Sequence, residues 1–180
     1  MILIALRAPG IELTPHTTKK IFSQKINNRR SARIIAVQCI YAIEHDTAYS
    51  KNVDEKLAEI ISIYTNELSD SKLSSVNQSY LIKLVRFAAI NKSGIEAEVT
   101  KHLSKEWKIS RIPKLIYCIL ICAVGELLLM ETLNKKIIIN DYLEIAKLFN
   151  HVGEAGFINS ILDKIEITSC DLQSINQQCI

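Results

Sequence analysis

The residues of this 180-residue chain that best suit a chemical role are the lysines and arginines near its start. Between His16 and Arg33 the sequence has six Lys and Arg residues and no Asp or Glu. A helix beginning near Asn28 would carry Arg29, Arg30 and Arg33 on one surface. Guanidinium groups bind phosphate oxygens and stack on unpaired bases, and a helix N-terminus also favours anions. The run therefore predicts a phosphate or RNA contact, with a solvated basic surface as the alternative.

Groups that could form a catalytic or metal site do not converge in the sequence. The four histidines lie at positions 16, 45, 102 and 151 and have no ligand spacing, and the five cysteines contain no Cys-x-x-Cys pair. Glu126 lies inside an apolar run, where we expect a buried structural carboxylate bonded to a neighbouring helix start. A glycine-rich phosphate loop is also missing from the sequence. We expect no enzymatic activity, no metal and no cofactor.

Composition favours one helical domain. Apolar residues make up 48% of the chain and charged residues 23%, and only five Gly and three Pro interrupt it. The apolar run 115–130 contains Glu126 and is shorter than the roughly 20 residues that cross a bilayer, so we expect a buried central helix. The sequence predicts an all-α, soluble, cytoplasmic protein with no membrane contact.

Apolar periodicity predicts about seven helices and no strand. Their expected ranges are about 28–45, 53–68, 75–93, 95–103, 113–133, 140–149 and 154–167. Ser75 with Gln78 matches a capping box, Ser93-Gly94 suits a helix end, and Asn140 suits an N-cap. The expected core includes Tyr41, Leu120, Ala123, Leu127, Phe157 and Ile161. We expect a flexible basic extension over 1–25, the helical RNA-binding domain over 26–168 and a polar tail over 169–180.

Several segments, in their order along the chain, resemble the NusB family. They are the arginine-rich start followed by Ala36-Val-Gln-Cys-Ile-Tyr41, Trp107 with Arg111, Ile119-Leu120 with Glu126-Leu127, Ile139-Asn-Asp141 with Ala146-Lys147, and Phe157-Ile-Asn-Ser-Ile-Leu-Asp163. The resemblance covers nearly all of the predicted helical body. It implies a NusB-like fold of two packed helical bundles.

The resemblance also implies a function and its residues. NusB proteins are non-enzymatic antitermination factors that bind boxA-type single-stranded RNA of ribosomal RNA transcripts. They do so together with a small-subunit ribosomal protein, NusE, in the RNA polymerase antitermination complex. The family's RNA contacts correspond here to Lys25, Arg29, Arg30, Arg33 and Phe157.

The partner contact differs from the family pattern. A charged pair near the start of the long helix is replaced by Ile116 and Tyr117, which suggests a less charged NusE contact. One alternative is an RNA-binding domain like the N-terminal part of a ribosomal RNA cytosine methyltransferase, which requires a downstream nucleotide-binding fold. This chain ends at Ile180 without such a fold. A purely structural helical scaffold is the third interpretation, and the clustered arginines argue against it.

Overall fold

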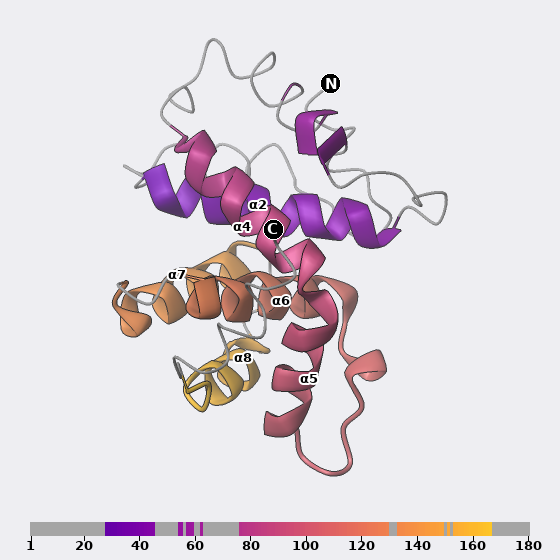
Figure 1. Ribbon diagram of the computed structural model, residues 1–180. Coiled ribbons are helices and arrows are strands. Elements are labelled where there is room, and N and C mark those ends of the chain that lie inside the picture. The colour runs from indigo at the N-terminus through magenta and orange to yellow at the C-terminus, as the bar shows by residue number, and fades with distance from the viewer. Residues whose placement is uncertain are drawn as a thin grey trace. The chain divides into compact units, whose positions relative to one another are not determined.

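The computed structural model of this protein describes residues 28–45, 54–55, 57–59, 62, 76–129, 133–149, 151 and 153–166. Within these ranges the regular structure comprises six α-helices, one 3-10 helix, further helical residues between 54 and 62, and no strand (Figure 1). The predicted all-α class is confirmed. The chain divides into two compact units, Met1–Arg86 and Phe87–Ile180, which are described separately. The predicted terminal segments, 1–25 and 169–180, lie outside the described residues.

The first unit is built on helix α2, which spans Asn28–His45 as predicted. Its apolar stripe, made of Ala36, Val37, Ile40 and Tyr41, is buried. The expected helix over 53–68 is described only at a few positions between 54 and 62, and all of these are helical. Leu57, one of its expected inward-facing residues, is buried, and the others lie outside the described residues.

Helices α4 (Gln78–Ile90) and α5 (Lys92–His102) follow each other with a single residue between them. The predicted start of α4 at Ser75 is wrong, because Val76 and Asn77 are not helical and Asn77 Oδ1 accepts the Tyr80 amide at 3.0 Å. The predicted helix end at Ser93-Gly94 is also wrong. The break lies at Asn91, whose side-chain amide donates to the Phe87 carbonyl at 3.0 Å.

Helix α6 (Lys114–Leu129) is the most buried helix of the second unit, and every residue from Leu115 to Leu128 is buried. A short 3-10 helix, η2 (Ile109–Arg111), precedes it. The predicted end near Leu133 is too late, since Leu133 is not helical. Helix α6 packs against α5, α7 and α8, which is the central position expected for it. Among the described helices, none is long and apolar enough to cross a membrane.

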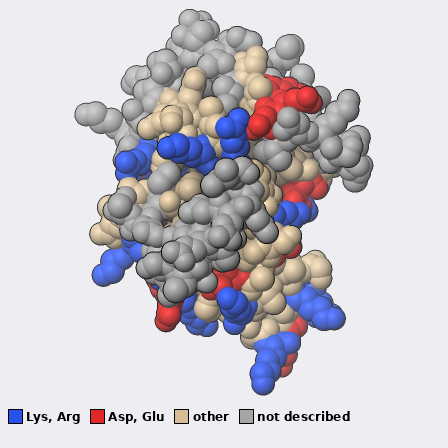
Figure 2. Space-filling view, viewed as in Figure 1, with Lys and Arg blue, Asp and Glu red and all other residues tan. Residues whose placement is uncertain are grey.

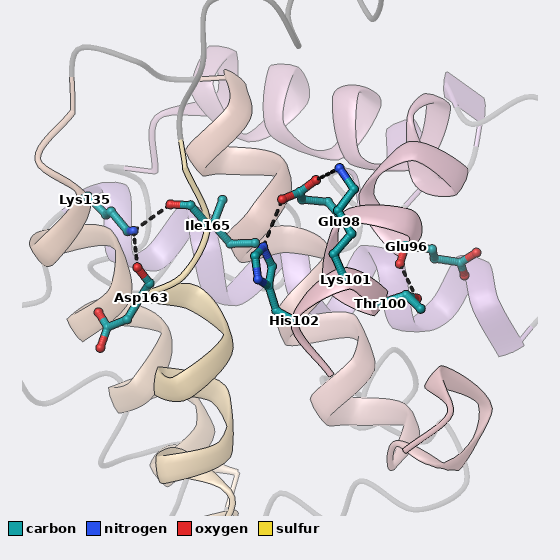
Figure 3. A network of polar contacts seen from close by, with 8 residues as sticks. All are labelled: Glu96, Glu98, Thr100, Lys101, His102, Lys135, Asp163 and Ile165. Carbon is teal, nitrogen blue, oxygen red and sulfur yellow. Dashed lines mark hydrogen bonds and ion pairs between the residues drawn. The ribbon is translucent and has the colours of Figure 1, made fainter. Parts of the chain in front are cut away.

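Helices α7 (Lys135–Leu148) and α8 (Ala155–Leu162) complete the second unit. The predicted N-cap at Asn140 is wrong, because the N-cap of α7 is Asn134, about 1.7 turns earlier, whose Oδ1 accepts the Lys136 amide at 2.9 Å. Helix α8 is shorter than its predicted range. The Lys135 ammonium donates to the Asp163 and Ile165 carbonyls, each at 2.7 Å, and so connects the start of α7 to the end of α8 (Figure 3).

A glycine allows close packing at the centre of the second unit. A Cβ added to Gly125 would lie 3.3 Å from Ile95 Cδ1 and 3.4 Å from Ala88 Cβ. Both distances are at the tight end of van der Waals contact. Gly125 therefore lets α6 lie directly against Ala88 of α4 and Ile95 of α5. Leu120, Ala123, Leu127, Ile161 and Tyr41 are buried as expected, whereas Phe157 is partly exposed.

Candidate nucleic-acid interface

Two of the predicted RNA-binding arginines lie accessible at the start of α2. Arg29 is exposed and Arg30 is half-buried, and the first turn of the helix contains no acid. The unbonded amides of a helix N-terminus carry partial positive charge, which adds to that of the guanidiniums. The Arg29 guanidinium lies 5.8 Å from the ring centroid of Tyr80 on α4. This end of α2 can bind phosphate.

Arg33 contradicts the expected surface position. Its side chain is only 1% exposed, and Nη2 donates to Tyr80 Oη at 3.1 Å. The helical period gives the reason, because Arg33 precedes Val37 by four residues and Ile40 by seven and so lies on the buried stripe. The guanidinium is also 5.8 Å from the Tyr80 ring centroid. The prediction that three arginines share an exposed surface is wrong for this residue.

Tyr80 also belongs to this region, although the sequence did not indicate it. Its ring lies near both the Arg29 and the Arg33 guanidiniums, and its hydroxyl accepts from Arg33. Its position 47 residues beyond Arg33 gives no local sequence signal. Lys25, the fourth predicted cation, lies outside the described residues. The described candidate interface of the first unit is therefore formed by Arg29 and Arg30, with the Tyr80 ring beside Arg29.

Phe157, the predicted aromatic contact, belongs to α8 in the second unit. Its ring centroid lies 5.5 Å from that of Trp107, and the two ring planes are 34° apart. Trp107 is 49% exposed and Phe157 is partly exposed. The pair therefore forms an accessible aromatic surface. Trp107 lies between Glu106 and Lys108 in the sequence, and nothing local linked it to Phe157.

The residues predicted to form an apolar partner contact are buried. Ile116 is 0% exposed and Tyr117 is 6% exposed, and Ile121 one turn later is also buried. The Tyr117 hydroxyl donates to Glu96 Oε1 at 2.5 Å, and Lys114 lies 5.1 Å from the Tyr117 ring centroid. An exposed apolar surface at these positions is therefore contradicted. The changes from the charged family pattern instead supply apolar volume to the buried α6.

The single carboxylate of the apolar helix has a structural environment. Glu126 is fully buried, and the Tyr142 hydroxyl donates to its Oε2 at 2.9 Å. This hydrogen bond comes from a side chain in the middle of α7. A buried structural carboxylate is confirmed, and its bond to a helix start stays a prediction. Among the described residues, no group of three or more His, Cys, Asp or Glu could hold a metal ion.

Known proteins resemble this chain over nearly the whole helical body. Residues 30–166 match the NusB family. The chain belongs to the NusB family. The NusB transcription antitermination protein of Rickettsia bellii (strain OSU 85-389) is 36% identical over 146 residues, which cover 79% of this chain and 92% of that protein. The NusB protein of Rickettsia felis is 32% identical over 148 residues, covering 79% and 94%.

Solved NusB structures show the same fold. One crystal form of T. maritima NusB matches with a TM-score of 0.64 at 20% identity, covering 83% of this chain and 99% of that one. A crystal structure of NusB and NusE in complex with dsRNA matches with a TM-score of 0.60 at 20% identity, covering 82% and 97%. At this identity the structural matches establish the fold, and the family follows from the sequence match.

Proposed function

We propose that this protein is a non-enzymatic, RNA-binding transcription antitermination factor. In this role it binds boxA-type single-stranded RNA of ribosomal RNA transcripts together with NusE and acts in the RNA polymerase antitermination complex. The observation that carries the proposal is the pair Arg29 and Arg30, accessible at an acid-free helix N-terminus. The antitermination proteins that are 36% and 32% identical support it. Both are transcription antitermination proteins, which favours this role over that of an RNA-binding domain of a methyltransferase.

The positive charges of the described residues at this site set its affinity for RNA. Two arginines and one helix N-terminus neutralise only a few phosphates, and the whole chain has a net charge of +3. Binding of RNA by the chain alone is then expected at a non-specific level, roughly micromolar or weaker at physiological salt. A second protein bound beside the site would extend the basic surface and raise the affinity through linked binding.

NusE is the proposed second protein. The fold is similar to that of a NusB bound to NusE and dsRNA, which supports this choice. Because Ile116 and Tyr117 are buried, they are not assigned to the contact. NusE therefore remains the proposed partner, and we expect it to bind accessible residues.

A binding titration tests the proposal. Labelled boxA-like RNA and a scrambled RNA of the same length are titrated with this protein, with NusE and with an equimolar mixture. The proposal predicts that the mixture binds boxA-like RNA at least about tenfold more tightly than either protein alone, a difference of about 1.4 kcal/mol. Equal affinity of the mixture and the better single protein would contradict cooperative binding. Equal affinity for the scrambled RNA would contradict boxA recognition.

A further inference from the structure

An accessible tryptophan in the second unit is held by a second aromatic ring. Trp107, the single tryptophan of the chain, follows α5 and is 49% exposed, and its ring lies 5.5 Å from that of Phe157 on α8. Aromatic rings whose centroids are this far apart attract each other, and the contact restricts ring orientation. The indole is therefore positioned by another element while much of its surface remains open. The two rings together offer an aromatic surface on which an unpaired base can stack.

The segment that carries Trp107 is strongly basic. Residues 101–114 contain five Lys and Arg residues and one acid, Glu106. All five cations are exposed; they are Lys101, Lys105, Lys108, Arg111 and Lys114. Figure 2 shows Lys and Arg side chains projecting at the lower end of the molecule, where α5 ends and the connection to α6 follows.

The cations nearest to the indole in the sequence are available for a ligand. Lys101 pairs with Glu98 at 2.6 Å. Within the part of the chain that the structure describes, Lys105, Lys108 and Arg111 take part in no ion pair. Lysine is depleted from protein–protein interfaces, whereas a positive surface with aromatic rings is typical of sites for single-stranded nucleic acid. The chemistry of this surface therefore fits RNA better than a protein partner.

We propose that Trp107 and Phe157, with Lys105 and Lys108, form a second contact for single-stranded RNA. An unpaired base stacks on the indole, and the two ammonium groups bind the adjoining phosphates. Bases in a duplex are already stacked on each other, so the surface selects unpaired RNA. This inference rests on the proposed RNA-binding function, in which Phe157 is already an expected RNA contact. It adds Trp107 as the stacking residue and Lys105 and Lys108 as phosphate contacts.

The single tryptophan makes the proposal directly measurable. Stacking of a base on the indole quenches its fluorescence, so emission from the full chain reports on this surface alone. A short single-stranded RNA should quench Trp107 emission in a saturable manner, with the same midpoint as binding measured from the anisotropy of labelled RNA. A duplex of the same sequence should bind with little quenching. An RNA that binds fully without any change in emission would overturn the proposal.

Substitutions provide a second readout. Trp107→Ala should weaken single-stranded RNA binding about tenfold, and Trp107→Phe should restore most of it, because a phenyl ring also stacks. Replacing Lys105 and Lys108 with Gln should lower the salt dependence of binding, by about 0.7 in slope for each phosphate that is no longer neutralised. Ile137→Ala is the matched control, because Ile137 is an exposed apolar residue of α7, 58% exposed, outside the basic segment. It should leave binding unchanged.

The outcomes separate this proposal from the proposed function. If the parent chain binds RNA without quenching and Trp107→Ala binds equally well, the second contact is wrong and the proposed function stands. If Trp107→Ala leaves RNA binding unchanged but weakens the binding of NusE measured without RNA, the surface is a protein contact and the proposal is wrong. If the parent chain binds no RNA with or without NusE, both fail. Circular dichroism melting of each variant separates loss of binding from loss of fold.

Discussion

The guanidinium of Arg33 donates a hydrogen bond to the hydroxyl of Tyr80 at 3.1 Å, inside the protein. This bond joins α2 to the first turn of α4. Arg33 therefore contributes to folding, although it belongs to the basic run that predicted RNA binding. Its neighbours Arg29 and Arg30 remain accessible, so one sequence motif divides into a structural residue and two candidate ligand-binding residues.

Arg33→Ala should lower the free energy of unfolding by about 2 kcal/mol or more, because it leaves the buried Tyr80 hydroxyl without this donor and creates a cavity. Tyr80→Phe should cost about 1 kcal/mol, since the ring remains and only the hydroxyl is removed. Urea denaturation measures both. Arg29→Ala is the control and should be within about 0.5 kcal/mol of the parent. Equal stability of the Arg33→Ala variant and the parent would contradict this structural role.

Gly125→Val should destabilise the second unit by about 2 kcal/mol or more, because the added methyl groups would collide with Ile95 and Ala88. Gly125→Ala should have a smaller effect. Its Cβ requires a shift of a few tenths of an ångström at Ile95, and the higher helix propensity of alanine offsets part of the cost. Thermal denaturation compares the two, with Gly94→Ala as the control, because a Cβ at Gly94 meets nothing within 4 Å. A Gly125→Val variant as stable as the parent would contradict the close packing.

Glu98, near the end of α5, should make a small contribution to the free energy of unfolding that is lost in acid. Burial raises the pKa of Glu98, but hydrogen bonds and charges of Lys101 and His102 outweigh it, so the pKa is lowered from its ordinary value of 4.5 (Figure 3). The unfolded chain therefore binds this proton more readily, and the stabilisation is present above pH 4.5 and is lost as the pH falls through the folded pKa.

Glu98→Gln should lower the unfolding free energy slightly at pH 7, by less than about 1 kcal/mol, because the Lys101 side chain of this ion pair is mostly exposed. The difference from the parent should shrink as the pH falls below about 4.5. Chemical denaturation across this pH range measures it, with Glu106→Gln as an exposed control. If the difference in unfolding free energy between the parent and Glu98→Gln grows as the pH falls, the pKa of Glu98 is not lowered by folding.

The sequence predicted the elements with regular apolar spacing and missed features that depend on contacts between distant residues. The bounds of α2 followed from its stripe and flanking residues. The start of α7 did not, because Asn140 and Asn134 are both suitable caps and only the fold shows that Asn134 accepts the Lys136 amide. The apolar run correctly predicted that α6 is a buried central helix. The family resemblance nevertheless placed Ile116 and Tyr117 of this helix in a partner contact, and the structure buries both.

The candidate site shows the same limit. The basic run marked the correct end of α2, and its helical spacing already placed Arg33 in line with Val37 and Ile40. Arg33 could therefore have been assigned to the interior from the sequence. The partners Tyr80 and Trp107 could not, because each meets its counterpart only through the fold, 47 residues away for Arg33 and Tyr80.

The RNA affinity of the double variant Arg29→Ala/Arg30→Ala tests the central claim most directly. BoxA-like RNA is titrated with parent and variant, each in the presence of NusE, over a range of salt concentrations. The account predicts binding about 10- to 100-fold weaker at low salt and a salt slope smaller by about 1.4, because the variant neutralises two fewer phosphates. The control Lys136→Ala/Lys147→Ala removes the same charge from exposed positions of α7 and should change both quantities much less. Parent-like affinity and slope in the arginine variant would contradict the account.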